Sequence, residues 1–200
     1  MEIDNNVYPP NFSNRTLFHG DNLDFMRAMN SETIDLIATD PPFNKGKDFH
    51  ATPDSLTAGA KFQDRWSWEQ DVHQSWIDEI KNDNSRVMHA IQCARETHSD
   101  SMGAFLCFLA VRLLSMHRIL KPTGSIYLHC DQTANSYIRM IMDAIFGVNN
   151  FRNEITWSYN RFSRRGDSYA RMADTILFYT KSKLYHFEKP IGVARDNDRY

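Results

Sequence analysis

The sequence has few cysteines, and their spacing points to neither disulfides nor a structural metal. The three cysteines, Cys93, Cys107 and Cys130, stand far apart and form no CxxC pair. We therefore expect buried thiols in a reducing compartment. The eight histidines show no HxxxH spacing, so we predict no metal site.

Long apolar runs and a strong net charge are missing too. We find no apolar stretch long enough to span a bilayer, and the first residues, with Glu2 and Asp4, carry no secretory pattern. We expect a cytoplasmic protein with no membrane partner. The formal net charge of −2 argues against a generally basic coat protein for nucleic acid, although it allows a local basic strip.

Strand and helix patterns alternate along the chain, which predicts an α/β sheet with helices on its faces. Residues 1–14 are interpreted as an extended arm and residues 15–200 as one domain. The expected strands are Thr16–His19, Ile34–Thr39, Ser125–Cys130, Phe151–Tyr159 and Thr175–Thr180. The expected helices are Asn22–Met29, a block from Gln70 to His117 with breaks near Asn82 and Ser99 and a strongly apolar last part over Met102–Leu120, and a helix that Asp131 or Thr133 caps and Gly147 ends. Lys121–Gly124 is predicted to be a turn, and Phe43–Gln63 a long mobile loop.

The sharpest chemical feature is Asp40-Pro41-Pro42-Phe43, directly after the strand Ile34–Thr39. In open α/β sheets, ligands gather at the carboxyl ends of strands. The prolines fix φ and lack N–H groups, so this turn is rigid and offers acceptors. The Asp40 carboxylate and the Pro41 carbonyl can accept the two N–H bonds of an exocyclic amine, and Phe43 offers a face for a base removed from a duplex. The plain alternative is a strand-ending turn with a buried phenylalanine, and the position after a buried strand favours function.

Several further stretches complete a pattern around this motif. They are His19–Leu23, Ile34–Ile37, Asp40–Gly46, Phe62–Trp68, Met116–Asp131, Met142–Gly147 and Asp174–Ser182. Together they resemble the N6-adenine/N4-cytosine DNA methyltransferases. The resemblance is strongest to the permuted, beta-class branch, in which the catalytic motif precedes the cofactor-binding motif. It covers nearly the whole chain from Thr16 onward.

This resemblance implies a Rossmann-like, S-adenosylmethionine-dependent methyltransferase sheet that is incomplete at its C-terminus, and a direct methyl transfer to double-stranded DNA. The catalytic motif would consist of Asp40, Pro41, Pro42 and Phe43, while Asp21, Asn22 and Asp40 would lie near the methyl donor. An aspartate at the first motif position favours N6 of adenine, whereas serine is more usual for N4 of cytosine. A C5-cytosine mechanism needs a nucleophilic cysteine, and the chain has no Pro-Cys pair. A restriction subunit is a further partner that the family allows.

The chain departs from the family in two places. No two of the eight glycines stand within three residues of each other, so the glycine-rich cofactor loop is absent and in the permuted branch would lie beyond Tyr200. We therefore expect the chain alone to bind S-adenosylmethionine weakly. Relatives commonly place a histidine at the position of Ala173, which bears on the surroundings of the base pocket. Three hypotheses stay open: an adenine-N6 methyltransferase present in part, an N4-cytosine or non-DNA amine methyltransferase, and a DNA-binding remnant without catalysis.

Residues 151–175 form the predicted DNA-contacting region. Its arginines are Arg152, Arg161, Arg164, Arg165 and Arg171, and they are interleaved with Trp157, Tyr159 and Phe162. Basic residues among aromatics suit phosphate contact and base stacking. The alternative is a solvated charged surface.

Several other conspicuous residues are not assigned to catalysis. The resemblance implies that Trp66 and Trp68, together with Asp64 and Glu69, form an edge of the catalytic cleft, whereas residue type alone predicts half-buried packing for the two tryptophans. His129 and Asp131 follow a strand and could line a cleft, but a helix cap at Asp131 explains the sequence equally well.

Overall fold

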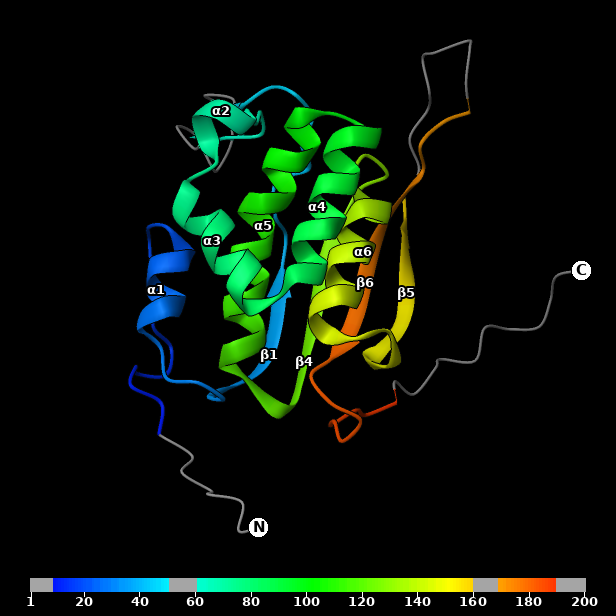
Figure 1. The fold of residues 1–200 in the computed structure, drawn as a ribbon. Coiled ribbons are helices and arrows are strands. Elements are labelled where there is room, and N and C mark those ends of the chain that lie inside the picture. Colours follow the sequence, from blue (N-terminus) through cyan, green and yellow to red (C-terminus); the bar gives the residue numbers. More distant parts are fainter. Residues whose placement is uncertain (1–8, 51–60, 160–168, 190–200) are drawn as a thin grey trace, which may run out of the picture.

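Helices and strands alternate along residues 9–50, 61–159 and 169–189, which are the residues that the computed structural model describes (Figure 1). In chain order the elements are α1 (Asn22–Ala28), β1 (Ile34–Thr39), β2 (Phe49–His50), β3 (Lys61–Phe62), α2 (Trp68–Asp71), α3 (Gln74–Asp83), α4 (Ser85–Thr97), α5 (Asp100–Ile119), β4 (Leu120–Cys130), α6 (Asn135–Phe146), η1 (Val148–Asn150), β5 (Phe151–Ser158) and β6 (Ala173–Thr180). The predicted α/β class is confirmed.

The main sheet has the strand order β1-β4-β6-β5. β1 and β4 run parallel and are connected through α2 to α5, whereas β6 is antiparallel to both of its neighbours. The carboxyl ends of β1 and β4 therefore meet the start of β6 at one edge of the sheet, at the top of Figure 1. This edge is where ligands of such sheets bind.

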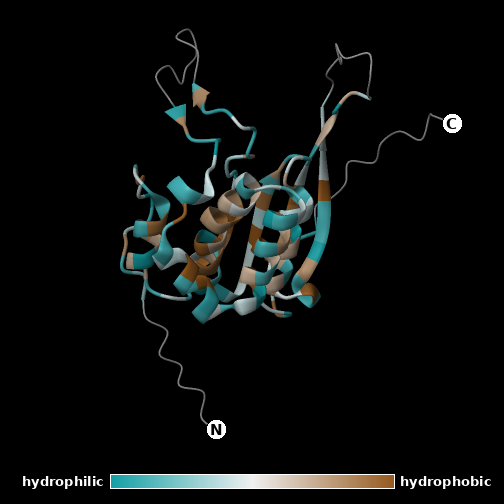
Figure 2. Ribbon diagram, turned by 45° about the horizontal axis from the view of Figure 1, so that its top comes forward, coloured by the Kyte–Doolittle hydropathy of each residue, from teal (hydrophilic) through white to brown (hydrophobic). Residues whose placement is uncertain are grey.

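The core lies between the sheet and α5, a helix of 20 residues that Ser99 caps by accepting a hydrogen bond from the amide of Met102. Figure 2 shows hydrophobic residues along α5 and the strands behind it, and hydrophilic ones on the outer helices. By length and hydropathy, α5 could cross a bilayer, so the expectation that no such stretch exists was wrong. Within the fold, 78% of its apolar window is buried, which is typical of a core helix.

The predicted turn at Lys121–Gly124 appears as an irregularity inside β4. Leu120 pairs with Ile34, and the next pair joins Ser125 to Leu36, so the residues between them bulge out of the ladder. The bulge carries Pro122, which has no N–H to give to a ladder. After the bulge, β1 and β4 pair regularly up to the residue at which β1 ends.

Three details of secondary structure differ from expectation. Thr16–His19 forms no strand, because no neighbouring strand pairs with it in the described part of the chain, and Leu17 is almost fully exposed. The predicted loop Phe43–Gln63 carries a short antiparallel hairpin of β2 and β3, and its residues 51–60 lie outside the described residues. Neither Asp131 nor Thr133 caps α6, since Oδ1 of Asp131 accepts a hydrogen bond from the amide of Thr133 in the preceding turn.

The cysteines divide into two kinds. Cys107 and Cys130 are buried as expected, and burial raises the pKa of each thiol to about 12. Cys93 is exposed on α4, so the expectation of burial was wrong there. Its neighbours Ala94 and Ile91 take the inward positions of that helix, which leaves residue 93 on the outer side.

Candidate active site

Asp40 lies at the carboxyl end of β1, and the residues after it run irregularly along the same edge of the sheet. Its side chain is 70% exposed, while Pro41 is buried. Asp40 borders two hollows. The larger, of about 750 Å³, is lined by Asp40, Pro41, Pro42, Phe43, Lys45, Lys47, Asp48, Phe49, His50, Phe62 and Asp64. The smaller, of about 490 Å³, is lined by Ala38, Thr39, Asp40, Tyr127, His129, Trp157 and Ile176. Both volumes suit a small ligand.

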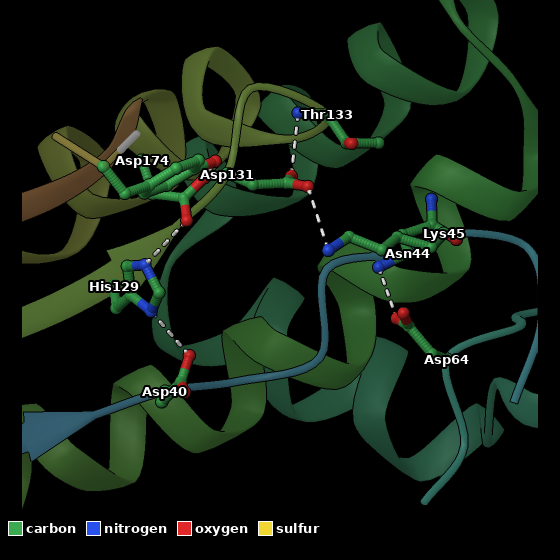
Figure 3. Close-up of polar contacts among 9 residues, drawn as sticks. Asp40, Asn44, Lys45, Asp64, His129, Asp131, Thr133 and Asp174 are labelled. Carbon is green, nitrogen blue, oxygen red and sulfur yellow. Dashed lines mark hydrogen bonds and ion pairs between the residues drawn. The ribbon is translucent and has the colours of Figure 1, made fainter. Parts of the chain in front are cut away.

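His129, on β4, contacts the catalytic-motif candidate directly (Figure 3). Its Nδ1 lies 2.8 Å from Oδ1 of Asp40, and the Phe43 ring meets the imidazole edge-on at 5.2 Å between centroids. Its Nε2 is 3.6 Å from Oδ2 of Asp174 on β6, just beyond hydrogen-bond length. Sequence reasoning left His129 unassigned, because the pairing of β4 with β6 that brings Asp174 to it is invisible in the sequence.

Asn44 fixes the turn that follows the motif. Its backbone adopts φ of 59°, a left-handed conformation that asparagine tolerates better than most residues. Its amide donates a 2.5 Å hydrogen bond to Oδ1 of the buried Asp64, and Ser101 on α5 donates to its side-chain oxygen at 3.0 Å. These contacts tie the motif to the core. Sequence reasoning pointed to Asp64 only through the family resemblance, which implies that it lies at an edge of the catalytic cleft with Trp66 and Trp68.

Lys45 and the hairpin form the outer wall of the larger hollow. The Lys45 ammonium lies 4.6 Å from the centre of the Phe43 ring and 3.5 Å from Oδ2 of Asp131. Phe49 and Phe62 stack across the β2–β3 pair with their centroids 4.7 Å apart, and both rings are about half exposed. The hollow thus combines apolar faces with two lysines and several acidic groups, a mixture that suits a planar polar ligand.

Asp21 and Asn22, the other predicted cofactor-binding residues, lie at the start of α1. Both contact Arg112 of α5, which donates from Nε to Asn22 at 3.1 Å and from Nη2 to Asp21 at 2.8 Å. Burial lowers the pKa of Arg112, and the Asp21 carboxylate opposes that effect. Among the described residues, neither Asp21 nor Asn22 lines a hollow that Asp40 borders, so the structure does not bring the three predicted residues into one pocket.

The arginine-rich stretch is seen only at its ends. Arg161, Arg164 and Arg165 lie outside the described residues, and Arg171 is exposed just before β6. Arg152 lies at the other described end of this stretch. At the start of β5, it donates to Thr180 at 2.8 Å and stacks its guanidinium 4.4 Å from the centre of the Tyr185 ring, at the sheet end opposite to Asp40.

Two other predictions can be compared with the side chains. Trp66 is buried against Phe105 and Phe108, with ring centroids 6.0 and 4.2 Å away, so the predicted packing role is confirmed, although the side chain is more deeply buried than expected. Trp68 packs its ring under the guanidinium of Arg95 at 4.2 Å. No group of three or more potential metal ligands occurs in the part of the chain that the structure describes.

Comparison with known proteins adds the family to this geometry. The family model of the N6/N4 DNA methylases matches residues 34–198. The Mod subunit of the type III restriction-modification enzyme StyLTI from Salmonella typhimurium is 30% identical over 186 residues, which are 90% of this chain and 26% of that protein. The DNA adenine methyltransferase YhdJ of Escherichia coli is 25% identical over 183 residues, 90% of this chain and 46% of that protein.

The solved structure of M1.HpyAVI with S-adenosylmethionine superposes with a TM-score of 0.41 and 17% identity, over 92% of this chain and 60% of that one. The chain spans about a quarter of the length of the first Mod subunits that it matches. The family model covers most of the chain and includes the Asp40-Pro41-Pro42-Phe43 motif at the end of β1. This chain belongs to the family of N6/N4 DNA methylases.

Proposed function

We propose that this chain supplies the catalytic motif of an enzyme that transfers a methyl group from S-adenosylmethionine to N6 of adenine in double-stranded DNA. The observation that carries the proposal is the exposed Asp40 carboxylate, which stands at the end of a sheet strand between two hollows, within a motif that the family model includes. Similarity to proteins named as an adenine methyltransferase and as Mod subunits supports adenine as the base.

In this proposal Asp40 and Pro41 orient the amine. The free oxygen of Asp40 and the Pro41 carbonyl accept the two N–H bonds, which aims the nitrogen lone pair away from both acceptors. The nitrogen attacks the methyl carbon, the carbon–sulfur bond breaks, and the amine then loses one proton to Asp40 or to water. Phe43 would stack on the base, which must leave the duplex to reach this edge.

The residues present fit the methyl donor in part. The Asp40 carboxylate borders both hollows and can face a sulfonium charge, whereas the polar groups of Asp21 and Asn22 already contact Arg112. When bound, S-adenosylmethionine supplies an electrophilic methyl group. Asp40 is the residue of this chain that we propose to face the methyl donor. Asp21 and Asn22 would act indirectly, by holding the start of α1 against Arg112.

The partners and setting follow from the same proposal. Double-stranded DNA is the substrate, and the exposed Arg171 with Arg161, Arg164 and Arg165 would contact its phosphates within the DNA-contacting region 151–175. Relatives named as Mod subunits of restriction-modification enzymes favour a restriction subunit as a further partner and the cytoplasm as the place of action.

A methylation assay tests the proposal. The full product of the gene that encodes this chain is incubated with methyl-labelled S-adenosylmethionine and a pool of DNA duplexes, and the digested nucleosides are identified by mass spectrometry. We expect the label in N6-methyl-2′-deoxyadenosine. Duplexes whose adenines already carry N6-methyl groups serve as matched controls. Label in N4-methyl-2′-deoxycytidine would show that the target base is cytosine and not adenine. No label in any nucleoside would refute the activity.

A further inference from the structure

A line of side chains crosses the main sheet at the edge where Asp40 lies. Tyr159, just after β5, donates from its hydroxyl to Oδ1 of Asp174 on β6 at 3.2 Å. The other oxygen of Asp174 lies 3.6 Å from Nε2 of His129, and Nδ1 of His129 lies 2.8 Å from Oδ1 of Asp40 (Figure 3). Every strand of the main sheet, or the residue directly after it, thus contributes one member.

Strand register explains why these residues meet. Thr39 pairs with Leu128, so Asp40 and His129 are the next residues on two parallel neighbours. His129 pairs with Ile176 on β6, and Asp174 stands two residues before Ile176, on the same face of the strand. Leu128 and Cys130 point toward the buried helix side, so His129 and its partners lie on the opposite face.

The imidazole is confined on several sides. An ionised carboxylate only accepts hydrogen bonds, so Nδ1 of His129 donates to Asp40. Nε2 is shielded from solvent and has no hydrogen-bond partner among the described residues, with Oδ2 of Asp174 at 3.6 Å. The edge-on Phe43 ring closes a further side. The imidazole is therefore held in one orientation, with its Nδ1–H group directed at Oδ1 of Asp40.

The orientation of Asp40 depends on this contact. With its side chain 70% exposed, Asp40 would otherwise rotate among its rotamers. The hydrogen bond occupies Oδ1 and leaves Oδ2 as the oxygen open to a ligand. Preorganised acceptors accelerate a reaction because no reorganisation is needed when the substrate arrives.

We propose that His129 is a positioning residue for methyl transfer, which lies between Asp40 and Asp174 and holds the Asp40 carboxylate with Oδ2 free for the target amine. This inference rests on the function proposed above. His129 acts through Asp40 and itself touches no reacting atom.

Two substitutions separate positioning from mere packing. His129→Leu keeps bulk but removes the donor, and His129→Asn keeps a donor near the place of Nδ1. His186→Leu, at an exposed imidazole, is the matched control. In the full gene product we expect His129→Leu to lower kcat about tenfold to a hundredfold, the effect of removing one hydrogen bond to a charged group, with KM for DNA nearly unchanged. His129→Asn should restore most of kcat, and His186→Leu should match the unaltered protein.

Each outcome decides the inference. A kcat for His129→Leu within twofold of the unaltered protein would overturn it. So would equal losses in both His129 variants together with a raised KM or a lowered melting temperature, since these indicate a structural role. If the unaltered protein transfers no methyl group, the proposed function fails together with the catalytic part of the inference. Nitrogen NMR of the imidazole still tests the contact between His129 and Asp40, because Nδ1 must carry the proton and respond to Asp40→Asn.

Discussion

Both carboxylate oxygens of Asp21 lie 2.8 Å from Nη2 of Arg112, although the two residues are 91 positions apart in the chain. The Arg112 side chain is only 6% exposed, and its guanidinium also stacks 3.6 Å from the centre of the Phe108 ring. Asp21 in addition caps α1 by accepting from the amide of Leu23. One aspartate therefore begins a helix and balances a buried cation.

This double role gives a stability prediction. Asp21→Asn keeps a good capping residue but removes the charge, so the change in stability reports the unbalanced Arg112. We expect the free energy of unfolding to fall by about 1–3 kcal/mol, less than for a fully buried pair because Asp21 is half exposed. Urea unfolding measures it. Asp35→Asn, which breaks the exposed pair with Lys121, is the control and should cost less than about 0.5 kcal/mol.

Asp40→Ala should abolish methyl transfer while largely sparing the affinity for DNA. Asp40 is proposed to act on the amine, and an interaction made chiefly in the transition state appears in kcat. We expect kcat to fall at least about a hundredfold, by comparison with the effect of a removed electrostatic contact. Single-turnover rates measure this decrease, and Asp35→Asn on the same strand should behave like the unaltered protein. Near-normal turnover of Asp40→Ala would refute the proposed role.

Arg164→Ala combined with Arg165→Ala should weaken DNA binding nearly equally for all sequences. Removing one phosphate-binding cation reduces the slope of log affinity against log salt concentration by about 0.9. Fluorescence anisotropy at several salt concentrations gives the slope. Arg86→Ala, on the first turn of α4 near Gly147 and Lys181, is a control at the end of the sheet opposite to Asp40. An unchanged slope would mean that the two arginines are solvated surface, and weaker binding to one sequence only would mean that they read bases.

Asp64→Ala should loosen the turn after the catalytic motif. It leaves the amide of Asn44 buried without its acceptor, which costs about 1–3 kcal/mol of the free energy of unfolding. Hydrogen exchange at residues 44–46 should accelerate more than exchange in α5, because the substitution removes the tie to the core only locally. Asp48→Ala, whose carboxylate makes a longer 3.3 Å contact, should have a smaller effect. Equal exchange in both variants would contradict this account.

The thiols should react unequally. Burial raises the pKa of Cys107 and Cys130 to about 12, whereas Cys93 is exposed. A thiol-specific disulfide reagent at pH 8 should therefore label one cysteine in the folded chain and all three in denaturant. Folding raises both pKa values above the ordinary thiol value of about 8.5, so the stability that these groups add is complete below that pH and is lost as the pH rises toward 12. Rapid labelling of Cys107 in the folded chain would contradict the buried core.

The sequence was informative where local chemistry dominates. The bounds of β1 and the place of Asp40 followed from an apolar run ended by two prolines, and both appear in the structure as predicted. The stop of α6 at Gly147 also followed from local rules, and this glycine has φ of 85°. Thr16–His19 failed as a strand because strand formation needs a partner, which local propensity does not contain.

The site itself was only half predictable. The contact between His129 and Asp174 arises from the antiparallel pairing of β4 with β6, and the contact between Asp21 and Arg112 from the packing of α1 on α5. Asp131 was interpreted as a helix cap, whereas it contacts Lys45 and the preceding turn. Such pairs depend on tertiary arrangement, and a single sequence without co-variation carries no signal for them.

The pairing of Thr39 with Leu128 sets the side of the sheet on which the next residue, Asp40, lies, and this disfavours a misaligned sheet. If β1 slid by one residue along β4, every side chain of β1 would change sides, and Asp40 would turn toward the helix layer. There its carboxylate would leave His129 and meet the hydrocarbon of the core, where burying a charge is costly. The charge that we propose to handle the substrate therefore also penalises the wrong alignment, so any substitution of Asp40 by an apolar residue removes a safeguard of folding together with the proposed chemistry.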